Sequence, residues 1–176
     1  MRGISAALCA LSLALPLGAS DFQVRGQVTL NQPTQDLKTA LDGKLGYGLG
    51  IHGLHRHGFQ HTSRTRLDWN VWGQGNPVKG VKTQVSNYHL AFDHLYHFDD
   101  RDHGAYLVGG LGAVRWFTER ETVLGANRSH TTKLGITGGA GYQFNRNLGL
   151  EGRVLVSSID KTYDSTLVQG AVVFRF

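Results

Sequence analysis

Apolar and polar side chains alternate along much of the chain with a period of two residues. The stretch FQVRGQVTL, residues 22–30, places Phe22, Val24 and Leu30 on one face and Arg25 and Gln27 on the other. Successive side chains of a strand point to opposite faces of a sheet, so this pattern predicts a strand with two chemically different faces. The same pattern predicts eight strands, over residues 22–31, 45–56, 61–72, 84–98, 105–117, 132–144, 148–159 and 166–176.

The segments between the predicted strands alternate between short and long. HGFQ, DDRDHG and NRN are short turns, and the four connections that alternate with them are longer. The first long connection contains DLKTAL, for which we expect a helical turn. Both ends of the strand series then lie on the short-turn side. Transmembrane barrels show this asymmetry, with short periplasmic turns and longer external loops.

The distribution of charged and aromatic residues indicates that the polar face points inward. Charges lie on the polar faces of most predicted strands: Arg25, Arg64, Arg66, Asp68, Asp93, Lys133, Glu151, Arg153 and Arg175. Aromatic residues lie near the strand ends, where membrane barrels carry aromatic girdles, and we expect these rings to face outward: Phe22, Tyr47, Trp69, Phe98, Tyr106, Trp116, Tyr142, Phe144, Phe174 and Phe176. The sequence therefore predicts an all-β, eight-stranded antiparallel up-and-down transmembrane β-barrel, which closes on itself and leaves no unpaired edge in lipid.

The interior of a barrel with eight strands has room only for side chains. Six glycines fall on the predicted inner face and make space for long side chains: Gly46, Gly48, Gly50, Gly135, Gly139 and Gly141. Five charged residues lie at similar counts from the short-turn end: Arg25, Arg66, Asp93, Glu151 and Arg153. Because buried charges must pair, we expect these five to form a lumen charge network that fills the barrel and leaves at most a narrow, gated water path.

The last predicted strand ends in LVQGAVVFRF, and its alternation continues to the final residue. This ending resembles the C-terminal strand of bacterial outer-membrane barrels: Gln169, Phe174 and Phe176 match that pattern, and Ala171 stands where glycine is usual. The chain as a whole resembles the small eight-stranded OmpA/OmpX-type, porin-like barrel family. The resemblance implies a location in the bacterial outer membrane and recognition of the terminal aromatic by the barrel-assembly machinery. It implies no particular activity.

The first twenty residues differ from the rest of the chain. Arg2 precedes the apolar run AALCALSLALPLG, and LGAS offers small residues for cleavage. This is the pattern of a secretory signal peptide, so we expect a signal peptide over residues 1–20 and a barrel domain over residues 21–176. Cleavage after Ala19 and cleavage after Ser20 both fit. The one cysteine, Cys9, lies inside this segment, so no disulfide is expected in the mature protein.

Nine histidines form the most unusual feature of the composition, and they gather in HGLHRHGFQH and DHLYHFDDRDH around two short turns. Imidazole and carboxylate groups can bind zinc, copper or nickel. However, strand neighbours alternate between faces, so His52 and His55 cannot both point into the lumen of a regular strand. No metal site and no cofactor are expected. His61 and Ser63 share a face, but catalysis would need a hydroxyl, a base and an orienting group to converge, and we expect no catalytic residues.

These observations favour a non-enzymatic outer-membrane barrel with a structural or surface-interaction role played by its loops. The expected partners are outer-membrane lipid, lipopolysaccharide and the barrel-assembly machinery, and the barrel is expected to be a monomer. The net charge of +5 is spread along the chain, without the basic cluster that nucleic-acid binding requires. A small gated pore is the first alternative, and a lipid-modifying enzyme is the second.

Overall fold

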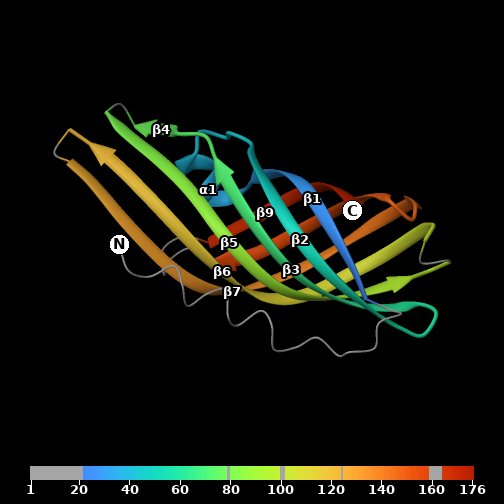
Figure 1. Cartoon of the computed structure of the whole chain (residues 1–176). Coiled ribbons are helices and arrows are strands. Elements are labelled where there is room, and N and C mark those ends of the chain that lie inside the picture. The colour runs from blue at the N-terminus through green and yellow to red at the C-terminus, as the bar shows by residue number, and fades with distance from the viewer. Residues whose placement is uncertain (1–21, 79, 100–101, 124, 159–163) are drawn as a thin grey trace.

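Eight antiparallel strands form a closed barrel in the computed structural model, which describes residues 22–78, 80–99, 102–123, 125–158 and 164–176. β3 pairs with β5 and β1 pairs with β9, so the sheet closes on itself and the predicted fold is confirmed (Figure 1). The predicted signal peptide lies outside the described residues. The barrel strands are β1 (Phe22–Pro33), β2 (Gly46–His57), β3 (His61–Trp72), β5 (Val81–His97), β6 (Gly104–Thr122), β7 (Gly125–Asn145), β8 (Leu148–Ser158) and β9 (Asp164–Arg175).

The long-loop end contains more regular structure than the sequence predicted. β6 and β7 continue to Thr122 and Gly125 and stay paired to that point, so the expected loop is a protruding hairpin. The short strand β4 (Gly75–Val78) pairs with β5 beside it. Both faces of these extensions are polar, as expected for strands that have left the membrane. The alternation that marks the other strands is therefore absent here, and the sequence prediction ended too early.

The first long loop contains the helix α1 (Gln35–Ala40), within the segment where a helical turn was predicted. Gly43 ends this segment with a positive φ of 68°, and its N–H donates to the carbonyl of Lys38 at 2.8 Å. Two leucines four residues apart, Leu37 and Leu41, are buried with exposed fractions of 2% and 0%. Within the part of the chain that the structure describes, no helix has the length and hydropathy needed to cross a membrane.

The outer surface of the barrel is apolar, as the alternation predicted. Leu30, Phe92 and Leu134 are exposed by 60%, 65% and 68%, whereas the polar residues next to them along the strands point inward. Two of the ten aromatic assignments were wrong, because Tyr106 and Trp116 are buried inside the barrel. Both lie on β6, where apolar residues occupy both faces and the pattern gives no decision.

Residues paired side by side on neighbouring strands form rows around the barrel. Because the strands are tilted, each row rises from the short-turn end toward the long-loop end. The row that begins at Arg25 on β1 passes through His52 and Arg66 and reaches β9 at Ser165. Arg25 itself pairs with Arg175, ten residues further along β9. This stagger over eight strands corresponds to a strand tilt of roughly 40°. Residues at equal counts from the short turns can therefore lie at different heights in the lumen.

Candidate functional site: the filled lumen and the vestibule above it

A cluster of charged side chains fills the half of the lumen nearer the short turns, which we call the lower half. We call it the ionic cluster, and it consists of Arg64, Arg66, Asp68, Asp93, Glu151 and Arg153. Arg64 donates two hydrogen bonds to Glu151, at 2.7 and 3.0 Å, and a third to Asp93 at 2.9 Å. Arg66 connects Asp93 to Asp68. Three arginines thus face three carboxylates, and the cluster is balanced in formal charge.

Glu151 on β8 is the most connected carboxylate of the ionic cluster. Besides Arg64, it accepts a hydrogen bond from Arg153 at 2.9 Å and another from the Tyr106 hydroxyl at 2.8 Å. Its exposed fraction is 3%. Charge pairs buried to this extent hold one another in place, because removal of one member leaves the others charged and unpaired. The cluster therefore obstructs the lumen with charged groups whose separation costs considerable free energy.

Four of the five residues of the predicted charge network lie in the ionic cluster, namely Arg66, Asp93, Glu151 and Arg153. Arg25 does not, since its guanidinium donates to Gln143 at 2.6 Å, nearer the short-turn end. The climb of the hydrogen-bonded rows separates Arg25 from the others, although it lies in the same row as Arg66. Arg64 and Asp68 were left out of the predicted network. They share the inner face of β3 with Arg66, two residues before it and two residues after it. This spacing was the sequence signal that could have placed them in the network.

The upper half of the lumen is closed by apolar side chains, which we call the apolar plug. Its members come from α1 and from strands on all sides: Leu37, Leu41, Trp72, Val85, Val114, Trp116, Leu155 and Leu167. The Trp72 and Trp116 rings stack with centroids 5.9 Å apart. A side chain at Gly46 would collide with the Trp72 ring, so the inner-face glycine makes room for an indole. Gly141, another of the six predicted inner-face glycines, likewise faces an aromatic side chain, the ring of Tyr106.

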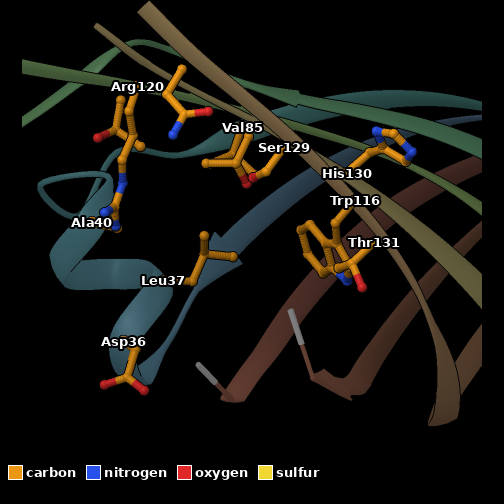
Figure 2. Close-up of a pocket in the computed structure, with 12 residues that line it drawn as sticks. Asp36, Leu37, Ala40, Val85, Trp116, Arg120, Ser129, His130 and Thr131 are labelled. Atoms are coloured by element: carbon orange, nitrogen blue, oxygen red, sulfur yellow. The ribbon is translucent and has the colours of Figure 1, made fainter. Parts of the chain in front are cut away.

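A cavity of about 360 Å³ lies between α1 and the protruding β6–β7 hairpin, above the apolar plug. We call it the vestibule. Figure 2 shows α1 on one side, with labelled residues of β5, β6 and β7 on the other. Its lining combines acidic, basic, amide and hydroxyl groups with a few apolar ones: Asp36, Leu37, Ala40, Thr83, Val85, Trp116, Thr118, Arg120, Asn127, Ser129, His130 and Thr131. The sequence prediction did not include these residues, because they come together only through the loop and the hairpin.

An ionic contact crosses the opposite, short-turn end of the barrel. Asp102 accepts hydrogen bonds from Arg56 and from Arg146, each at 2.9 Å. Burial alone would raise the pKa of the Asp102 carboxyl, but the hydrogen bonds and positive charges of Arg56 and Arg146 hold this pKa below its ordinary value. Asp102 therefore stays ionised at neutral pH and joins two short turns to the end of β2.

The histidine-rich segments divide between the two faces, as the alternation predicted. His52 is buried in the lumen, while His55 points outward. The structure does not bring His61 and Ser63 together: His61 lies 3.1 Å from a ring nitrogen of His94, and Ser63 lies 3.0 Å from His57. In the described ranges, no group of three or more histidine, cysteine, aspartate or glutamate residues has the spacing of a formed metal site.

The residues of the expected assembly signal lie on both faces of β9. Gln169 points inward, is 1% exposed and donates to the side chain of Asn31 at 2.6 Å. Phe174 and Phe176 point outward at the short-turn end, with their ring centroids 5.4 Å apart. These two rings lie over Gly26 of β1, where an added side chain would collide with them. The final aromatic residues thus cover the seam where the first and last strands meet.

Comparison with known proteins supports the architecture. Neither a family model nor a curated protein sequence matches the chain. Among solved structures, Ail, the attachment invasion locus protein of Yersinia pestis, is similar with a TM-score of 0.64 and 13% identity, over 89% of this chain and 98% of Ail. The N-terminal β-barrel domain of Pseudomonas aeruginosa OprF gives a TM-score of 0.60 and 15% identity, over 88% of this chain and 99% of that domain.

Neisserial surface protein A gives a TM-score of 0.57 and 16% identity, over 88% of this chain and 97% of that protein. At these identities the similarity concerns the fold, and in the fold it extends over nearly the full length of each barrel. The chain therefore has the fold of the small eight-stranded outer-membrane β-barrels, the OmpA/OmpX-type architecture that its sequence resembles, and this fold together with the apolar outer surface indicates the bacterial outer membrane as its location.

Proposed function

We propose that the chain is a non-enzymatic outer-membrane barrel with a sealed lumen, which acts at the cell surface through its long-loop end. The observation that carries this proposal is the filling of the lumen at two heights, by the ionic cluster and by the apolar plug. Small gated pores need a water path, and these two layers oppose one. The lipid-modifying alternative is weaker still, because the group beside the His57 ring is the His55 ring rather than a carboxylate that would orient it.

The vestibule is the feature of the long-loop end best suited to bind a small ligand. Its volume falls within the range of ligand pockets, and its lining offers many donors and acceptors beside an apolar floor. Such a mixture suits a ligand rich in hydroxyl groups, so the ligand class that we propose is a saccharide. Ail, which shares the fold, has been crystallised with the heparin analogue sucrose octasulfate. That complex is a precedent for a sugar ligand on this architecture.

Two measurements test this function. The refolded barrel should show no steady conductance in a planar bilayer, and a stable ohmic current would overturn the sealed lumen in favour of the pore.

In calorimetric titrations with a neutral oligosaccharide and with sucrose octasulfate, Arg120→Ala and Asn127→Ala should weaken binding about tenfold, the size of one lost hydrogen bond to a charged or buried group. Arg128→Ala is the matched control, because Arg128 pairs with Glu119 outside the vestibule. Equal affinities in all variants would reject the saccharide site.

Lipopolysaccharide and the barrel-assembly machinery are the partners that we propose in the membrane. A groove of about 480 Å³ on the outer surface has a mainly apolar lining, which suits an acyl chain: Leu90, Phe92, Leu111, Gly112, Ala113, Thr132, Lys133 and Leu134. Arg115, the next outward residue on β6, lies over the Phe117 ring at 5.4 Å and is placed to pair with a phosphate.

Each membrane partner has its own test. Arg115→Ala should lower the amount of lipopolysaccharide that co-purifies with the barrel, and Arg128→Ala should not.

Deletion of Phe176 should reduce accumulation in the outer membrane much more than it weakens the barrel refolded in detergent, because one side chain contributes at most about 1.5–3 kcal/mol of burial. Unchanged lipopolysaccharide content, or wild-type accumulation, would contradict the respective partner.

A further inference from the structure

Histidines from three neighbouring strands gather on the outer surface near the short-turn end. His57 of β2 lies directly opposite His61 of β3. His94 of β5 lies opposite Ser63, the next outward position on β3. His57, His61 and His94 are all exposed, and we call them the histidine patch. The function proposed above makes no use of them.

Two rings of the histidine patch, those of His61 and His94, lie close enough to share one ligand. Nδ1 of His61 and Nε2 of His94 are 3.1 Å apart, with ring centroids at 5.2 Å. Two imidazoles that both coordinate one tetrahedral zinc ion at about 2.0–2.1 Å have nitrogens roughly 3.3–3.4 Å apart. The backbone therefore already holds these two side chains at the separation that a shared metal ion requires. Since both rings are exposed, they are free to turn their lone pairs toward a common point.

We propose that the histidine patch binds a divalent transition-metal ion, with His61 and His94 as the first two ligands. His57 supplies a third nitrogen when its ring turns from Ser63, to which it is now bound at 3.0 Å, and water completes the coordination. An all-imidazole ligand set favours copper, nickel or zinc over magnesium and calcium, which prefer oxygen ligands. The sequence analysis missed this arrangement because it grouped the histidines around each short turn, whereas the patch joins His57 and His61 of the first group to His94 of the second.

The position of the histidine patch makes it accessible to ions from the short-turn side. It flanks the β2–β3 turn, and His61 and Tyr96 are in contact with ring centroids 5.4 Å apart. Aromatic residues at strand ends mark the membrane–water boundary, so the patch lies at the level of the lipid headgroups. A metal ion bound there would not have to enter the lumen or the apolar belt.

The test uses the full mature barrel, refolded in detergent and purified without a polyhistidine tag. Calorimetric titration with Cu²⁺ and with Zn²⁺ should show one site per barrel, and the electron paramagnetic resonance spectrum of the Cu²⁺ form should show at least two nitrogen ligands. His61→Ala and His94→Ala should each weaken binding about tenfold or more, and the double variant should be little worse than either, because the two ligands act together.

His103→Ala is the matched control, since His103 lies beside Tyr142 of β7, away from the three strands of the histidine patch, and its affinity should equal that of wild type. Retained heat-modifiable mobility would show that each variant has folded, so a lost affinity reports on the ligands. Absence of binding to the wild-type barrel, unchanged affinity in His61→Ala or His94→Ala, or a spectrum with a single nitrogen ligand would overturn the proposal.

Discussion

Glu151→Gln should lower the free energy of unfolding of the barrel by about 3–5 kcal/mol, the cost of breaking a buried ion pair from one side. Glu151 accepts hydrogen bonds from Arg64, Arg153 and Tyr106, and an amide keeps its size while losing its charge. Arg64 and Arg153 would then retain only part of their compensation in a place that water does not reach. Urea titration of the refolded barrel in lipid vesicles, followed by tryptophan fluorescence, measures this loss.

Glu119→Gln provides the control for the loss of a carboxylate. Glu119 also pairs with an arginine, Arg128, but that contact lies in water at the long-loop end, so the change should leave the free energy of unfolding nearly unchanged. The double variant Glu151→Gln with Arg64→Gln should recover part of the stability, because it removes a charge together with its partner. Equal urea midpoints for Glu151→Gln and wild type would mean that the negative charge of Glu151 does not stabilise the folded barrel.

Val154→Arg should destabilise the barrel by about 2–4 kcal/mol when it is refolded in a bilayer, the cost of an arginine near the midplane on the lipid face of a barrel. Val154 lies in the middle of β8, between Gly138 of β7 and Val168 of β9, and it points outward. The same arginine at Ala126, which is exposed on the protruding hairpin, meets water and should change little. An equal tolerance at the two positions would mean that the apolar outer surface does not contact lipid.

The sequence predicted the barrel well because its alternation reports a strong physical difference between the two faces. On β1 an outward side chain meets lipid and an inward one meets other polar groups, so the pattern gives the face of each residue directly. On β6 this difference is lost: Val108 and Val114 point inward while Leu107 and Leu111 point outward. Val114 lies in the apolar plug, and Val108 lies in a second buried apolar group with Leu95 and Tyr106, so at these positions hydrophobicity no longer distinguishes the inner face from the outer one.

The contents of the lumen were harder to predict than the identity of its lining residues. Which inner residues meet depends on the stagger of the sheet, and the stagger is set only when β1 pairs with β9 across the seam. That pairing joins the two ends of the barrel domain and leaves no local signal in the sequence. Arg25 was misplaced for this reason. The vestibule was missed for a related one, since its walls are brought together by α1 and a hairpin whose polar composition is that of a loop.

The ionic cluster also bears on how the barrel enters the membrane during folding. Arg64 and Glu151, which two hydrogen bonds join, are separated by 87 residues along the chain, on β3 and β8. A strand-by-strand insertion would carry Arg64 of β3 into the hydrocarbon region before β5 arrives with Asp93 and long before β8 arrives with Glu151, and a charge without its partners there costs several kcal/mol. This cost favours insertion together with closure, in which the early strands stay near the headgroups until the late ones complete the pairing. The finished barrel should be slow to open for the same reason, because neither β3 nor β8 can leave without exposing charged side chains of the ionic cluster.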